Sequence, residues 1–320
     1  MKHFKILKKF FLLSAFILVV TSMISCSSEE EINAKKSTIT GIVQSQSGLS
    51  TFGVALQRTN LLTTLDASGT YTVFAPTNLA FDNFLALYGF ASINDVPTAT
   101  LKEILLNHVI GQSLKSIDLP ASGYITTMAT GSSSTNKLSM YVNKSSGVVL
   151  NDVAEVKNAD VLASNGIIHI VDAVIGLPTV FDHIIANPNL TSLVGVLTGT
   201  GQPDYPTILS GTGPFTVFAP VNTAFVSLNT EIAGGVPGVS AANMTKLLNY
   251  HVTAAAFLTT NLTEGQIINS LQSPQTFTVL LSGGPKVKDV NNRVSNITTP
   301  NIQCSNGVVH LTNKVMLPTF

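Results

Sequence analysis

The sequence predicts a mixed α/β protein made of two tandem domains of the same fold, each a β-sandwich or wedge with packed helices. The main observation is a block that occurs twice, as YTVFAPTNLAF at Tyr71–Phe81 and as FTVFAPVNTAF at Phe215–Phe225. The two copies lie about 140 residues apart, whereas solenoids and propellers repeat every ~20–50 residues. The repeated unit is therefore a whole domain, and a length of 320 residues fits two of them.

The repeated block itself predicts a strand, a stop and a helix. Thr72, Val73 and Phe74 favour a strand, and Pro76 ends it because proline has no N–H for the strand ladder. We expect Asn78 to be the N-cap of the following helix. Apolar residues follow at helical spacing until Gly89, a typical helix end: Phe81, Phe84, Leu85 and Tyr88.

A second helix in each half carries a histidine at the end of its apolar face. The spacing i, i+3, i+4, i+7 is typical of a helix that buries one side. The two faces are Leu101, Ile104, Leu105 and His108 in the first half, and Met244, Leu247, Leu248 and His251 in the second. Short alternating strands follow, and each half closes on a run that is apolar on both sides, as in a fully buried strand: NGIIHIV and NGVVHLT.

These segments resemble the three sequence boxes of the fasciclin (FAS1) domain family. The first box is the repeated block, the second is LLNHV (105–109) and LNYHV (248–252), and the third is NGIIHIVDAVIGLP (165–178) and NGVVHLTNKVMLP (306–318). The resemblance implies two FAS1-like domains, at residues 38–178 and 179–320. It also implies a structural role for the box residues Asn78, His108, His169, Asn222, His251 and His310. Asn107 stands where the family usually has Tyr, as in Tyr250, so we expect one aromatic contact to be lost in the first domain.

The composition favours a protein that works outside the cytoplasm. Hydrophobic residues make up 45% of the chain and charged residues only 11%, against ~25% charged in typical domains. Lysine and arginine together number 17, as do aspartate and glutamate. Because no basic stripe is present, a nucleic acid partner is not expected.

The first 25 residues have the pattern of a lipoprotein signal peptide. Four lysines precede an apolar run over residues 10–20, which is shorter than the ~20 residues of a membrane span. The sequence MISC resembles the lipobox of bacterial lipoproteins and implies lipid attachment at Cys26. Residues 26–37 then form an acidic, polar tether, in which SSEEE resembles a surface-export signal or is simply a solvated segment. We expect attachment to the outer membrane, at the cell surface or at its periplasmic face.

Two cysteines, Cys26 and Cys304, are present in the chain. If Cys26 carries lipid, Cys304 has no partner for a disulfide. Its flanking residues, NIQCSNG, offer no cation that would activate a thiol. We therefore interpret Cys304 as a small apolar residue of the core.

The histidines are the residues whose chemistry could serve an enzyme. As general bases or metal ligands they would need a nucleophile or further ligands at a characteristic spacing, and the sequence has no HExxH or CxxC motif. As core residues they would be neutral, with both ring nitrogens bonded to nearby polar groups. We favour the second interpretation, and we expect no cofactor and no metal.

Two short motifs of hydrolases are incomplete. GQSLK (111–115) lacks the second glycine of a nucleophile elbow. STNK (134–137) matches Ser-x-x-Lys but lies in a loop rich in Ser and Gly, where the serine does not begin a helix. An unrecognised hydrolase is thus the weakest of the functions considered.

One segment is a candidate contact site for a partner. NADVL (158–162), just before the third box, resembles the Asp-plus-aliphatic segment through which some animal members of the family engage integrins. The resemblance implies an exposed patch of Asp160, Val161 and Leu162; the alternative is an ordinary loop aspartate. The second domain has Asn301 and Ile302 at the matching positions, without the charge.

The sequence therefore predicts a non-enzymatic, lipid-anchored binding protein for cell adhesion or matrix binding, with a protein or a glycan as ligand at the cell surface. The alternative in another class is a glycan-binding accessory lipoprotein of a polysaccharide-uptake system. Exposed aromatic side chains would favour that alternative, but the chain has no Trp and aromatic residues make up only 7%.

Overall fold

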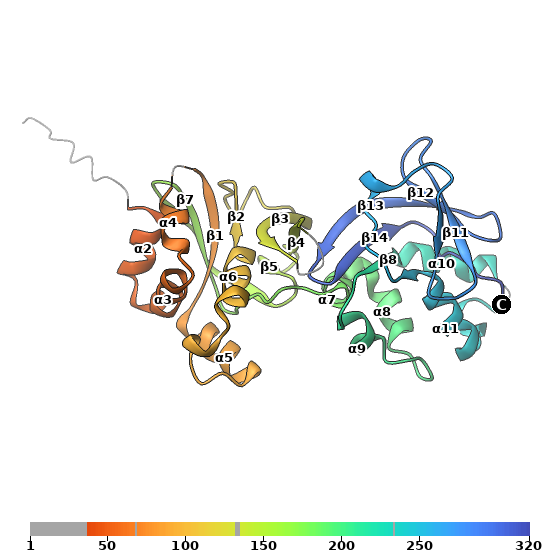
Figure 1. Cartoon of the computed structure of the whole chain (residues 1–320), viewed down its shortest axis with the longest axis horizontal. Coiled ribbons are helices and arrows are strands. Elements are labelled where there is room, and N and C mark those ends of the chain that lie inside the picture. The colour runs from red at the N-terminus through yellow and green to blue at the C-terminus, as the bar shows by residue number, and fades with distance from the viewer. Residues whose placement is uncertain (1–36, 68, 132–134, 233) are drawn as a thin grey trace, which may run out of the picture. The chain divides into compact units, whose positions relative to one another are not determined.

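The computed structural model describes residues 37–67, 69–131, 135–232 and 234–320 (Figure 1). The predicted signal peptide, the tether up to residue 36 and the lipid attachment site Cys26 lie outside the described residues. The remaining chain contains two domains, each with helices and one mixed β-sheet, so the predicted fold class and the duplication are confirmed.

The first domain begins with three helices. Its helices are α2 (Ile39–Ser45), α3 (Ser50–Arg58), α4 (Leu61–Asp66), α5 (Asn78–Tyr88) and α6 (Thr98–Asn107). Its strands are β1 (Tyr71–Pro76), β2 (Val109–Ile110), β3 (Ser122–Thr130), β4 (Lys137–Asn143), β5 (Val149–Leu150), β6 (Ala154–Ala163) and β7 (Gly166–Val171).

The second domain repeats this order of elements. Its helices are α7 (Val180–Ala186), α8 (Thr191–Leu197), α9 (Tyr205–Ser210), α10 (Asn222–Glu231) and α11 (Ala241–Tyr250). Its strands are β8 (Phe215–Pro220), β9 (Val252–Thr253), β10 (Ile267–Asn269), β11 (Thr276–Leu280), β12 (Lys286–Lys288), β13 (Val294–Cys304) and β14 (Gly307–Thr312).

The two sheets have the same topology. The order is β2-β1-β7-β6-β5-β4-β3 in the first sheet and, from the matching edge, β9-β8-β14-β13-β12-β11-β10 in the second. The strand of the repeated block pairs in parallel with the strand of the third box, β1 with β7 and β8 with β14, and the other pairs are antiparallel. Two boxes nearly 100 residues apart in sequence thus form neighbouring strands of each sheet, the second and third from one edge.

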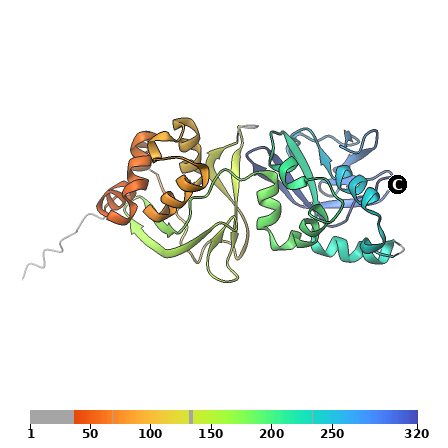
Figure 2. The same ribbon diagram turned by 90° about the horizontal axis from the view of Figure 1, so that it is seen from below.

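Each sheet buries both of its faces. In β1, Val73 and Ala75 pack with the helices in one apolar cluster, while Phe74 points into a second cluster with Met140 and Leu150. In β8, Val217 and Ala219 likewise belong to the helical cluster, while Phe218 packs with Phe277 in the second cluster. The helices of the first domain gather on one side of its strands in Figure 2. Two cores on a single sheet explain why the third-box strand is apolar on both faces.

Asn78 does not have the role expected from sequence. The N-cap of α5 is Thr77, whose side chain accepts a hydrogen bond from Ala80 N, and Asn78 is the first helical residue. Its Oδ1 instead accepts from Thr51 N at 3.0 Å, and its Nδ2 donates to Ser47 O at 2.8 Å. Asn78 therefore caps α3, a different helix. The reason is a contact across 27 residues of sequence, which no local pattern shows.

The matching residue of the second domain makes the same contacts. Asn222 Oδ1 accepts from Ser192 N at 2.9 Å, and its Nδ2 donates to Pro188 O at 2.9 Å. In both domains the first-box asparagine thus satisfies a free N–H at the start of an earlier helix. This repeated contact gives the box residue a structural function.

Replacing Asn78 with Ala is expected to lower the free energy of unfolding by about 2 kcal/mol, because the exposed start of α3 loses its cap and several hydrogen bonds. Asn83→Ala is the matched control, since Asn83 is exposed on the same helix. Urea unfolding of the two variants measures the difference. Equal stability of both variants would show that the Asn78 contacts contribute nothing.

Candidate functional site

The predicted contact segment lies at a β-bulge in β6. The pairing of β6 with β7 shifts register between Asn158 and Val161, and Asp160 has a φ of 61°. The left-handed region is unfavourable for most residues, and Asp and Asn tolerate it best. Asn301 occupies the same position in β13 with a φ of 60°. The bulge therefore explains why this position carries one of these two residues in both copies.

The carboxylate of Asp160 is engaged inside its own domain. Its Oδ1 accepts from Ser116 N at 2.7 Å, and its Oδ2 accepts from Ser116 Oγ at 2.6 Å. Partial burial tends to raise the pKa of Asp160, but the bonds from Ser116, together with the electrostatic influence of the nearby His169 ring and of Lys115, outweigh it and lower the pKa. Asp160 thus remains ionised at neutral pH while it holds the loop that contains Ser116.

The expectation of one exposed patch is correct only in part. Leu162 is 47% exposed. Val161, however, is partly buried and packs against the helical core cluster. The bulge turns Val161 inward and Leu162 outward. The exposed surface at this place consists of Leu162, the edge of Asp160 and the preceding residues 157–159.

The second copy of this segment is not available as a surface. Ile302 is 1% exposed and belongs to the helical core cluster of the second domain. Gln303, the residue that matches Leu162, is 7% exposed, and its N–H donates to Ser139 Oγ at 3.0 Å. A contact function for this segment is therefore confined to the first domain.

The histidines of the second box are buried and fully bonded to the backbone. His108 Nδ1 lies 2.8 Å from Ile104 O, and His108 Nε2 accepts from Ile175 N at 2.9 Å. His251 repeats this with Leu247 O at 2.8 Å and Met316 N at 2.9 Å. Because a backbone N–H can only donate, Nε2 has to be the acceptor and Nδ1 has to carry the proton. Both imidazoles are thereby held in one neutral tautomer.

The histidines of the third box have the opposite tautomer. His169 Nδ1 accepts from Asp160 N at 3.2 Å, and His310 Nδ1 accepts from Asn301 N at 3.0 Å. Their Nε2 atoms donate to Leu114 O at 3.0 Å and Phe257 O at 2.9 Å. Each of these histidines fastens the bulge of its domain to the loop beside it.

Burial also keeps these side chains neutral. Desolvation lowers the pKa of His108, His251 and His310 to about 4, against a backbone hydrogen bond that acts in the other direction. The pKa of His169 is lowered by the same cause. An imidazole whose two nitrogens are bonded to the backbone has no lone pair left for a substrate or a metal ion.

No cluster of three or more His, Cys, Asp or Glu side chains suited to a metal occurs among the described residues. Cys304 is buried, and desolvation raises its pKa well above the ordinary value. A thiol in this state is unreactive, so Cys304 acts as a core residue.

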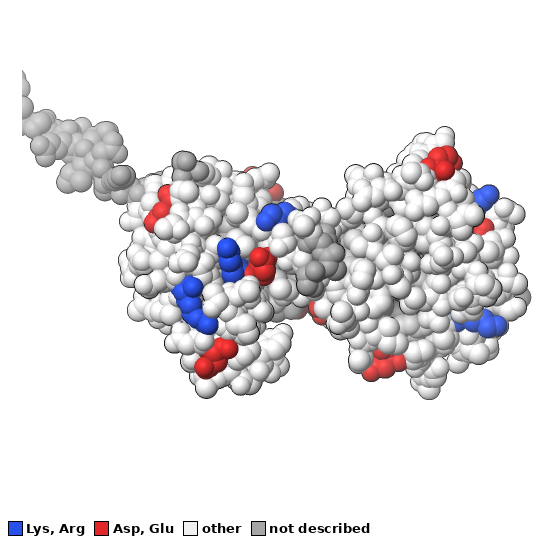
Figure 3. Space-filling model, viewed as in Figure 1, with Lys and Arg blue, Asp and Glu red and all other residues white. Residues whose placement is uncertain are grey.

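The surface carries few charges. On the face shown in Figure 3, acidic and basic side chains are scattered in small groups and neither sign forms a continuous patch. Within the described ranges, no helix combines the length and the apolarity that crossing a bilayer requires.

Comparison with known proteins identifies the class to which this fold belongs. The family model for the fasciclin domain matches residues 47–178 and residues 188–318. The chain belongs to the fasciclin domain family. Its fold is similar to the solved structure of a FAS1 domain pair from the insect cell adhesion molecule Fasciclin I, with a TM-score of 0.50 and 18% identity over 85% of this chain and 97% of that one.

Longer proteins of animals show similarity over most of the chain. Human periostin is 26% identical over 79% of this chain, and pig transforming growth factor-beta-induced protein ig-h3 is 26% identical over 79%. The matched region covers only 29% of periostin and 35% of ig-h3. The similarity therefore shows the domain type, and it assigns no activity and no ligand to this chain.

Replacing Asp160 with Asn is expected to leave the free energy of unfolding within about 1 kcal/mol of the original, because Asn301 makes the equivalent contacts to Thr259 in the second domain. Replacing it with Ala is expected to cost about 2 kcal/mol, since both bonds to Ser116 are lost and Ala is strained at a φ of 61°. Thermal unfolding of the two variants measures the difference. If Asp160 serves only to contact a partner, neither substitution should change the stability.

Proposed function

We propose that this protein is a lipid-anchored binding protein of the cell surface that attaches the cell to a protein ligand without catalysing a reaction. The observation that supports this most is the state of the box histidines. All four are committed to hydrogen bonds inside their own domains. Because these histidines hold loops in place, they are not free to act in catalysis, and we infer that the domains act through their surfaces by binding other molecules.

The anchor in this proposal is the lipid carried by Cys26. The apolar run before it and the MISC sequence support cleavage and acylation at this residue. An anchor with more than one acyl chain holds a protein firmly at a membrane, whereas a single chain binds reversibly. The acidic residues that follow would place the two domains at a distance from the outer membrane.

The proposed contact surface is the outward side of β6 in the first domain. Leu162 contributes an exposed apolar side chain next to the ionised edge of Asp160. Lys157, Asn158 and Ala159 are exposed directly before it. A small apolar centre with a polar rim is the usual arrangement of a protein–protein contact.

A protein ligand is favoured over a glycan. Sugar-binding sites stack aromatic rings against the sugar face. Of the large hydrophobic side chains that are well exposed among the described residues, the aromatic ones are Tyr88 and Phe320, and neither lies in the proposed contact segment. A hydrolase has no support from the geometry, because the four box imidazoles have no free nitrogen for a substrate.

Attachment of cells tests the proposal. We expect cells without the gene to attach to protein-coated surfaces several-fold less than cells with it, and Leu162→Asp to reproduce this loss. Val226→Asp is the control, since Val226 is 65% exposed on α10 and lies outside the contact segment. Equal attachment by all strains to every protein surface, or a loss seen only on glycans, would contradict a protein-binding adhesin.

A separate experiment tests the anchor. Cys26→Ala is expected to abolish incorporation of labelled palmitate and to release the protein from the membrane fraction. External protease is expected to degrade the anchored protein on intact cells. Protection from protease until the outer membrane is opened would place the protein on the periplasmic side.

A further inference from the structure

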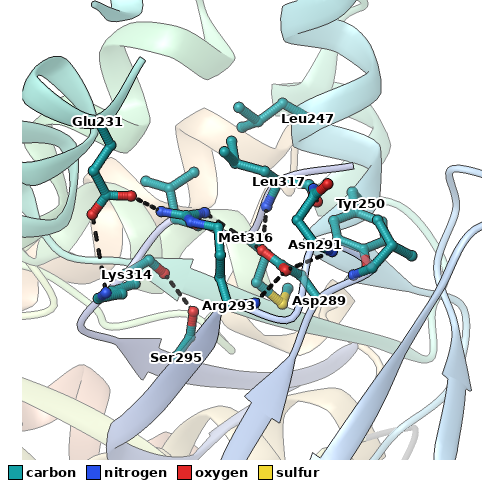
Figure 4. Close-up of polar contacts among 12 residues, drawn as sticks. Glu231, Leu247, Tyr250, Asp289, Asn291, Arg293, Ser295, Lys314, Met316 and Leu317 are labelled. Atoms are coloured by element: carbon teal, nitrogen blue, oxygen red, sulfur yellow. Dashed lines mark hydrogen bonds and ion pairs between the residues drawn. The ribbon is translucent and has the colours of Figure 1, made fainter. Parts of the chain in front are cut away.

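The two domains differ most at one corner of the fold. In the second domain, three segments meet there: the end of α10, the turn between β12 and β13, and the chain after β14. Figure 4 shows that charged side chains occupy the space between them. Asp289 is 3% exposed and accepts hydrogen bonds from Arg293 N at 2.9 Å and from Leu317 N at 3.0 Å. The guanidinium of Arg293 donates to Val315 O at 2.7 Å and forms an ion pair with Glu231.

In the first domain the same three segments enclose a cavity. It has a volume of about 310 Å³ and is lined by α5, by the turn between β5 and β6, and by residues 173–178. The charged residues of the second domain are replaced by apolar ones. Leu87, the tenth residue of α5, matches Glu231, the tenth of α10. Ala173 matches Lys314, because each is two residues beyond the last paired residue of β7 or β14.

The backbone and one residue of the second box also differ between the two domains at this corner. The connection between β5 and β6 has three residues, 151–153, whereas that between β12 and β13 has five, 289–293, so the first domain has no counterpart of the buried Asp289. In the second domain Tyr250 packs its ring 5.9 Å from Phe277 and accepts from Val290 N at 3.1 Å. Asn107 replaces this tyrosine, which removes the expected aromatic contact.

Apolar side chains surround the mouth of the cavity. Leu87 is 78% exposed, Tyr88 is 59% exposed and Val153 is 56% exposed, and all three line the cavity. Large apolar side chains grouped at a concave place mark a binding site more often than chance exposure does.

A buried polar atom at the cavity lacks a partner. Asn151 lines the cavity and is 5% exposed; its Oδ1 accepts from Tyr141 N at 2.7 Å, while its Nδ2 has no hydrogen-bond partner within the described part of the chain. Asn107, behind the cavity wall, donates to Gly176 O at 2.8 Å, and its Oδ1 is likewise unpartnered. An unsatisfied buried amide costs free energy. Nδ2 of Asn151 has almost no exposed surface, so a small rotation of this side chain toward the cavity would let an acceptor oxygen of a ligand remove that cost.

We propose that this cavity is a binding site for a small uncharged molecule with an apolar body and one carbonyl or hydroxyl oxygen. The apolar body would lie between Leu87 and Val153, and the oxygen would accept from Asn151 Nδ2. An anionic ligand fits less well, because the carboxylate of Asp182 also lines the cavity. A cavity of this size is at the lower end of the range for small-molecule sites. The site is independent of the adhesive role proposed above.

Octanamide is a suitable probe, because it carries one amide oxygen on a short apolar chain. We expect it to bind the full chain carrying Cys26→Ser with a Kd of ~1 mM or tighter, as a ligand of ten heavy atoms allows. In a ¹⁵N–¹H NMR titration the amides of Asn151, Val153 and residues 173–176 should shift and saturate together. Octanoate should bind at least tenfold more weakly.

Matched variants make the titration decisive. Leu87→Glu introduces the residue of the second domain and is expected to weaken octanamide at least tenfold without unfolding the exposed helix end. Leu79→Glu is the control, since Leu79 is 66% exposed on the same helix and does not line the cavity. Absence of saturating shifts at the cavity, equal binding to Leu87→Glu and Leu79→Glu, or equal binding of octanoate would overturn the proposal.

Discussion

Lowering the pH from 7.5 to 4.5 is expected to destabilise this protein strongly, and its second domain most of all. Four buried histidines, His108, His183, His251 and His310, have their pKa lowered to about 4, in each case chiefly by desolvation. In the unfolded chain each titrates near 6.5. Between these values the unfolded state binds more protons than the folded state, so stability is complete above pH 6.5 and is lost as the pH falls toward 4.

The size of this effect is large compared with the stability of ordinary domains. A pKa difference of between two and three units corresponds to ~3 kcal/mol for one fully buried histidine. Domains are stable by ~5–15 kcal/mol in total. One such histidine lies in the first domain and three lie in the second, so the second domain loses most of its margin. The hydrogen bonds give the same direction, because a protonated Nε2 of His108 would face the N–H of Ile175.

Urea unfolding at a series of pH values measures this. The window from pH 6.5 to 5 isolates the histidines, because the pKa values of Asp160 and Asp204 are lowered and these groups lose their contribution only at more acidic pH. An unfolding free energy that stays constant from pH 7.5 to 5 would show that the imidazoles are not held neutral by burial.

Asp289→Ala is expected to be the most destabilising single change in the second domain, with a loss of about 3–5 kcal/mol. The side chain of Asp289 has no exposed surface and lies 3.4 Å from the guanidinium of Arg293. It also accepts from the N–H groups of Asn291, Arg293 and Leu317. Its removal leaves buried donors without acceptors and frees the last segment of the chain from the β12–β13 turn (Figure 4).

The control is Asp204→Ala. Asp204 is exposed and accepts from Thr207 at the start of α9, so its loss affects one short helix end and is expected to change stability far less. Guanidinium unfolding of the two variants, followed by circular dichroism, gives the comparison. If both aspartates cost the same, the buried network does not hold the second domain together.

Local sequence patterns predicted the elements well. The helix that ends at Gly89 and the strand of the third box both rest on residues close together in the chain. The duplication added a second, independent example of each element. It therefore made the fold class certain from sequence, although no single segment did so.

The contacts that define the candidate sites could not be predicted from such local patterns, because they join residues far apart in the sequence. Asn78 caps a helix that begins 28 residues earlier, and Asp160 binds Ser116 from 44 residues away. The inward turn of Val161 depends on a bulge whose place is set by pairing with β7. The cavity of the first domain arises from replacements at three segments at once.

Nitrogen NMR of the imidazole rings tests the central claim most directly. The claim is that the four box histidines are neutral and hydrogen-bonded inside their own domains, and that the protein acts by binding. Long-range ¹H–¹⁵N spectra at pH 7 should show the neutral Nδ1–H tautomer for His108 and His251 and the neutral Nε2–H tautomer for His169 and His310, with N–H protons protected from exchange. A box histidine that titrates near pH 6.5, or whose N–H exchanges rapidly with water, would contradict the account.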